Sequence, residues 1–82
     1  MTAIPHTIDW NAVATEKLTR ILGADNGRST MTRALELSGL QSLQSADDLY
    51  RFAQELTAMA GFARAVGGML SLEAIMRGAR PA

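Results

Sequence analysis

The side chains best suited to chemistry in this 82-residue sequence lie in one short polar segment, residues 23–33. The segment reads GADNGRSTMTR, with two glycines ahead of an arginine and two hydroxyl side chains. A phosphate-binding loop has a related order, G-x-x-x-x-G-K-[ST], and follows a strand. Here the glycines are one residue too close, Arg28 replaces the lysine, and the preceding residues favour a helix. A turn followed by a helix N-cap at Ser29 or Thr30 explains the segment more simply.

The same segment also carries residue types that bind nucleic acid. Asparagine, arginine, serine and threonine contact phosphates and base edges. A helix-turn-helix with its recognition helix at residues 30–38 would use Asn26, Arg28, Ser29, Thr30 and Arg33. The formal net charge of zero disfavours this interpretation. So does the connection over residues 39–45, which is longer than the usual turn of such motifs. DNA binding therefore stands as the alternative hypothesis and requires a dimer.

Residues that could catalyse a reaction or bind a metal are sparse. Cysteine is absent, which excludes disulfides, thiolate zinc sites and thiol catalysis. His6 is the single histidine, and no carboxylate or nucleophile lies at an informative spacing from it. Asp47 and Asp48 are adjacent, so they do not face each other on a helix, but they suit its first turn. We expect no enzyme activity, no metal site and no cofactor.

The elements that position these residues are predicted to be helical throughout. Hydrophobic residues make up 48% of the chain, which favours a folded domain over disorder. Apolar residues at spacings of three and four predict helices over 9–22, 30–38 and 70–77. Asn26-Gly27 predicts a turn between the first two of these helices. We expect a flexible N-terminal arm over residues 1–7 and a single all-α domain of about four helices over 8–80.

The organising element is predicted to be a long central third helix that begins at Ala46. Ser45 is a suitable N-cap, with Asp48 at the third position of the helix. Gly67-Gly68 predicts a break or kink, because each glycine inside a helix costs roughly 1 kcal/mol. The helix is expected to reach Ala65 or beyond, because its apolar residues follow a heptad-like spacing: Leu49, Phe52, Leu56, Met59, Ala63, Val66 and Leu70.

The second half of this predicted helix is apolar or small on every side. Arg64 is the only charged residue between Glu55 and Glu73. An ordinary surface helix is apolar on one stripe only, so this helix needs neighbours on more than one side. Either the other three helices surround it, or a second chain covers it, and the two possibilities are compatible. The predicted partner or dimer interface comprises Leu56, Met59, Ala60, Gly61, Phe62, Arg64, Ala65 and Met69.

These observations favour a non-catalytic protein–protein interaction module, such as a small regulator, adaptor or inhibitor of a larger complex. It would dock on a protein partner or form a homodimer through the apolar and small residues of the third helix. No run approaches the ~20 apolar residues that span a bilayer, so we expect no membrane association. The first residues lack the pattern of a signal peptide, which predicts a cytoplasmic protein. The preference for arginine and alanine is typical of proteins from high-GC bacteria, and a small helical domain without an active site would also suit a phage-encoded protein.

Overall fold

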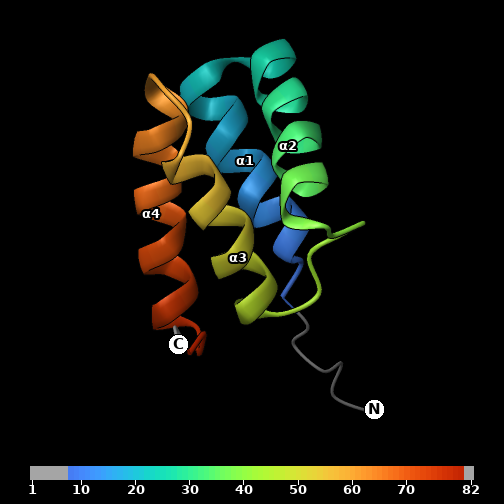
Figure 1. Cartoon of the computed structure of the whole chain (residues 1–82), viewed down its shortest axis with the longest axis vertical. Coiled ribbons are helices and arrows are strands. Elements are labelled where there is room, and N and C mark those ends of the chain that lie inside the picture. The colour runs from blue at the N-terminus through green and yellow to red at the C-terminus, as the bar shows by residue number, and fades with distance from the viewer. Residues whose placement is uncertain (1–7, 81–82) are drawn as a thin grey trace, which may run out of the picture.

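Four helices make up the computed structural model, which describes residues 8–80 (Figure 1). They are α1 (Trp10–Leu22), α2 (Ala24–Ser38), α3 (Ala46–Thr57) and α4 (Phe62–Met76). No strand occurs within residues 8–80, which confirms the predicted all-α fold of about four helices. The arm expected over residues 1–7, including His6, lies outside the described residues.

Helices α1 and α2 form a hairpin joined by a single residue, Gly23. Its φ of 88° is a conformation that glycine adopts readily, and it lets the chain reverse at once. The turn predicted at Asn26-Gly27 is therefore wrong, as is the N-cap at Ser29 or Thr30, because these residues all lie within α2. Gly27 lies inside α2, where an added Cβ would be 2.9 Å from the backbone N of Thr19. The glycine that suggested a turn instead lets α1 and α2 approach closely.

The start of α3 agrees with the prediction. The Ser45 hydroxyl accepts a hydrogen bond from the Asp48 N–H at 3.1 Å, and the Asp48 carboxylate accepts one from the Gln44 N–H at 3.0 Å. The long third helix is wrong, however, because α3 ends at Thr57 after 12 residues and is the shortest of the four. The chain then turns at Gly61, whose φ of 74° and ψ of −150° favour glycine.

The predicted heptad-like seam is shared between α3 and α4. Its members Phe52 and Leu56 on α3 and Val66 and Leu70 on α4 are all fully buried. The apolar period therefore continues across the turn at residues 58–61, although the helix does not. Sequence periodicity correctly predicted which of these side chains are buried and wrongly predicted a continuous helix.

The break expected at Gly67-Gly68 is also wrong, since both glycines lie within α4. The helix predicted over residues 70–77 is thus the second half of α4. Gly67 faces α3, where an added Cβ would lie 2.6 Å from the Thr57 backbone N and 2.8 Å from the Ala53 carbonyl oxygen. At Gly68 an added Cβ would meet nothing within 4 Å. Gly67 therefore permits the close packing of the two helices, and Gly68 faces away from them.

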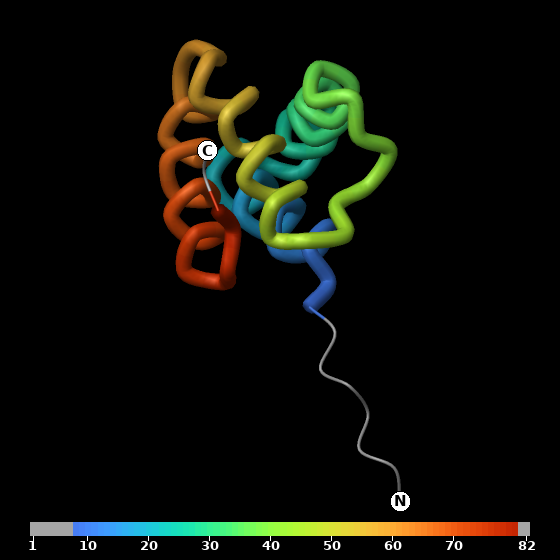
Figure 2. The backbone as a smooth tube through the Cα atoms, turned by 60° about the horizontal axis from the view of Figure 1, so that its bottom comes forward, coloured from blue at the N-terminus to red at the C-terminus, as the bar shows by residue number. Residues whose placement is uncertain are grey.

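Helices α2 and α4 lie on opposite sides of the molecule, as the two views agree (Figures 1 and 2). Helix α4 packs on α3 and along α1, and α2 packs on the same two helices. The connection between α2 and α3 is fixed to α1 by Asn11, whose side chain accepts from the Leu43 N–H at 2.9 Å and donates to the Leu43 carbonyl at 3.3 Å. The largest fully buried side chains form the core: Phe52, Leu18, Leu49, Leu56, Leu70 and Val66.

Candidate protein interaction surface

Helix α4 is apolar on two faces. Its inner face packs into the core through Val66 and Leu70, which are both fully buried. Its outer face carries five of the six exposed large hydrophobic side chains among residues 8–80, and the sixth is Leu37 on α2. The exposed fractions of the five are 72% for Phe62, 42% for Met69, 60% for Leu72, 44% for Ile75 and 75% for Met76.

Four of these side chains, together with Ala65 and without Ile75, form a continuous stripe along the helix. Phe62, Ala65, Met69, Leu72 and Met76 are all exposed and follow one another at spacings of three, four, three and four residues. That is the spacing of the a and d positions of a heptad, whose side chains share one helix face. We call these five residues the outer stripe. It runs from the first residue of α4 to the last.

Charge is absent from the outer stripe and sparse at its edges. Arg64 is the only charged residue in the first eleven residues of α4. Glu73 and Arg77 follow near the end of the helix, where the Arg77 guanidinium donates to the Glu73 carboxylate at 2.5 Å. An exposed helix face in a protein of this size is normally polar. The outer stripe therefore presents an apolar surface at a place where the fold itself does not require one.

The predicted interface residues divide between the core and this surface. Phe62, Ala65 and Met69 belong to the outer stripe, and the exposed residues Ala60, Gly61 and Arg64 lie at or near the start of α4. Leu56 is fully buried in the core, and Met59 packs against it, half-buried.

Sequence reasoning missed Leu72, Ile75 and Met76, because it assigned them to a separate last helix. The three-and-four spacing that continues from Phe62 to Met76 is the signal that could have identified them.

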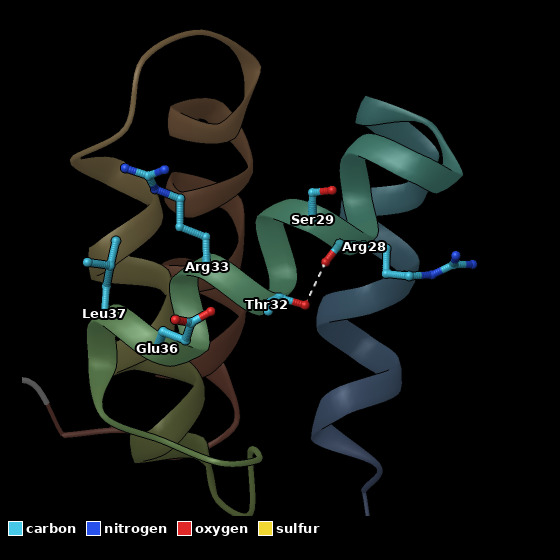
Figure 3. Close-up of a pocket in the computed structure, with 6 residues that line it drawn as sticks. All are labelled: Arg28, Ser29, Thr32, Arg33, Glu36 and Leu37. Carbon is cyan, nitrogen blue, oxygen red and sulfur yellow. Dashed lines mark hydrogen bonds between the residues drawn. The ribbon is translucent and has the colours of Figure 1, made fainter.

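The polar segment of α2 does not gather into a site. Asn26, Arg28, Ser29, Thr30 and Arg33 all lie within α2. The side chains of Arg28 and Arg33 point away from each other across a shallow surface hollow (Figure 3). Other side chains around the hollow are Ser29, Thr32, Glu36 and Leu37.

The connections around α2 also differ from a helix-turn-helix. The motif joins its two helices by a turn of about three or four residues. Only Gly23 separates α1 from α2, whereas residues 39–45 separate α2 from α3. The arrangement offers neither a converging pair of cations nor the usual geometry of a recognition helix.

The part of the chain that the structure describes contains neither a cluster of potential metal ligands nor a membrane-spanning helix. Within residues 8–80 no group of three or more histidine, cysteine, aspartate or glutamate side chains could hold a metal ion. None of the helices in that range is long and apolar enough to cross a membrane.

Among known proteins, no family model, no curated protein and no solved structure matches this chain.

Proposed function

We propose that the chain is a non-catalytic protein–protein interaction module that binds its partner through the outer stripe of α4. A small regulator, adaptor or inhibitor of a larger complex would act in this way. The observation that carries the proposal is that α4 is apolar on both its inner and its outer face, whereas the other helices of the chain cover only the inner face. The outer stripe contains no nucleophile and no titratable side chain. Its chemistry is therefore the burial of apolar surface.

The size of this surface supports the proposal. Taking roughly 150–200 Å² for each large side chain when fully exposed, the five exposed side chains of α4 offer roughly 500 Å². The largest apolar patch on a typical monomer is about 300–600 Å² and is often functional. Burial of apolar surface is the main favourable term in most protein–protein association, so a face of this size can supply binding free energy, although area alone does not set the affinity.

Site-specific photocrosslinking in the cells that produce the chain tests this proposal. Phe62 is replaced by p-benzoylphenylalanine, which keeps an aromatic side chain at one end of the outer stripe. The matched control places the same probe at Leu37, which is 54% exposed but lies on α2. We expect a discrete covalent adduct with a protein from position 62 and none from position 37. No adduct from either position, or the same adducts from both, would refute the outer stripe as a docking surface.

DNA binding through residues 28–33 has no structural observation in its favour, because the Arg28 and Arg33 side chains diverge and the acidic Glu36 lines the same hollow. A direct measurement separates the two functions. Duplex DNA binding that falls steeply with salt and disappears in the double variant Arg28→Ala, Arg33→Ala would restore this alternative.

A further inference from the structure

We infer that the partner of the outer stripe is a second copy of this chain, and that the two α4 helices pack antiparallel about a two-fold axis. This inference rests on the proposed function and names the partner for the same surface. Two-fold pairing is the commonest symmetry of soluble oligomers, and it places the same patch of both copies at the interface. A surface that binds its own copy must therefore be complementary to itself.

The spacing of the outer stripe meets this requirement. Side chains at alternating spacings of three and four pack as knobs into the holes of a helix that carries the same pattern. Every copy of the chain supplies such a helix, already folded and fixed on α3 and α1. Association would then order no additional backbone, and the entropic cost of binding stays low.

The order of large and small side chains favours the antiparallel arrangement. With the axis near the middle of α4, Phe62 lies opposite Leu72 of the second copy, and Ala65 lies opposite Met69 of the second copy. The small side chain of Ala65 thus meets a large one, Met69. In a parallel pair Ala65 would meet its own counterpart between layers of Phe62 and Met69, which leaves a gap in the packing. Antiparallel helix dipoles also attract each other.

The area available suits a second copy. With Phe62 opposite Leu72, the two α4 helices overlap over residues 62–72, so Ile75 and Met76 pack on the turn at residues 58–61 of the second copy. The two outer faces of roughly 500 Å² each then bury roughly 1,000 Å² at most. Stable and specific interfaces begin at about 1,200 Å², and about 1,000 Å² is the threshold for a biological interface. The interface therefore belongs to the small class, and we expect a reversible dimer whose population rises with concentration in the micromolar range.

Charge does not oppose the pairing. The chain has eight acidic and eight basic residues, so two copies do not repel each other at long range. Along one edge of the outer stripe, Glu73 and Arg77 already form an ion pair within their own helix. On the other edge, Arg64 and its counterpart in the second copy would be displaced by about 9 Å along the helix axis, at 1.5 Å per residue.

Disulfide trapping tests both the partner and the orientation, because the natural chain contains no cysteine. The single variants Phe62→Cys and Leu72→Cys are purified, one of them with a mass tag, and oxidised separately and as a mixture. In the antiparallel dimer each introduced thiol lies about 15 Å along the axis from its own counterpart, but opposite the thiol of the other variant. A disulfide requires a Cα–Cα distance of about 4.4–6.8 Å. We expect the tagged–untagged heterodimer in the mixture and at least ten-fold less self-linked dimer in each separate sample.

The other outcomes overturn the inference in distinguishable ways. Efficient self-linking of each single variant would show a parallel pair and refute the antiparallel arrangement. No disulfide dimer in any sample, together with a monomeric wild type at every concentration, would refute the second copy as partner. In that case a photocrosslinked adduct with a different protein at position 62 would leave the proposed function standing. The absence of any such adduct would refute both proposals.

Discussion

Two neighbouring glycines of α4 provide a matched test of how this helix is oriented. Gly67→Ala and Gly68→Ala add the same methyl group to the same helix, and both gain roughly 0.8–1 kcal/mol of helix propensity. Only the environment of the methyl group differs. At Gly67 it would lie 2.6 Å from the Thr57 backbone N and 2.8 Å from the Ala53 carbonyl oxygen, whereas at Gly68 it meets nothing within 4 Å.

The expected effects have opposite signs. Carbon atoms in favourable contact are about 3.5–4.0 Å apart, so the methyl at Gly67 overlaps the α3 backbone by roughly 1 Å. Because the obstacle is backbone, α4 must move away from α3 and loosen the layer around Val66 and Leu70. Overpacking of this kind costs about 1–3 kcal/mol, and at a backbone contact we expect the upper end. Gly67→Ala should then lower the free energy of unfolding by about 2 kcal/mol, and Gly68→Ala should raise it by up to about 1 kcal/mol.

Urea unfolding followed by far-UV circular dichroism measures both changes, at concentrations low enough for the wild type to be monomeric. With a slope of roughly 1 kcal/mol per molar urea, the midpoint should fall by about 2 M for Gly67→Ala and rise by less than about 1 M for Gly68→Ala. The total stability expected for 82 residues is about 4–12 kcal/mol, so the difference is readily measured. Equal effects of the two substitutions, or a stabilising Gly67→Ala, would refute the orientation of α4 that turns the outer stripe away from the core.

Two further predictions concern the contacts that position the helices. Asn11→Ala removes both hydrogen bonds to Leu43 and should lower the free energy of unfolding by about 2 kcal/mol, because it leaves part-buried backbone groups unpaired. The exposed Asn26→Ala is its control in the same urea assay, and equal shifts would exclude a role for the Asn11 contact. Ser45→Ala removes the N-cap of α3 and should cost about 1 kcal/mol, which Ser45→Asp should restore. A failure of Ser45→Asp to recover stability would show that capping is not the reason.

Where a helix end is determined by residues close to it in the sequence, the sequence alone was enough to predict that end. Ser45 followed by Asp48 predicted the start of α3 because an N-cap is made within one turn of chain. Asn26-Gly27 misled for the opposite reason. Its turn propensity is local, but Gly27 is required by the close backbone of Thr19, which lies on the preceding helix α1. Tertiary contact overrode propensity at that position.

The boundary between α3 and α4 was not predictable from periodicity. The apolar spacing fits both a continuous helix and two packed helices, because Leu56 and Ala63 are buried in either arrangement. The continuous helix and the two packed helices differ only in the backbone conformation at Gly61. The amino-acid composition of this segment does not determine that conformation. The candidate surface depended on a different point, the break predicted at Gly67-Gly68. Phe62 and Met69 were predicted to lie at an interface, but only an unbroken α4 places Leu72 and Met76 on the same exposed face.

The most direct test of the central claim is the absolute mass of the protein, measured by light scattering over a concentration series. Wild type is compared with Leu72→Glu, on the outer stripe, and with Leu37→Glu, a matched change at an exposed leucine of α2. A carboxylate buried without a partner costs several kcal/mol. We therefore expect wild type and Leu37→Glu to rise from 8.8 kDa toward twice that mass, and Leu72→Glu to remain at 8.8 kDa. A wild type that stays monomeric throughout, or a Leu72→Glu variant that associates like wild type, would contradict association through the outer stripe.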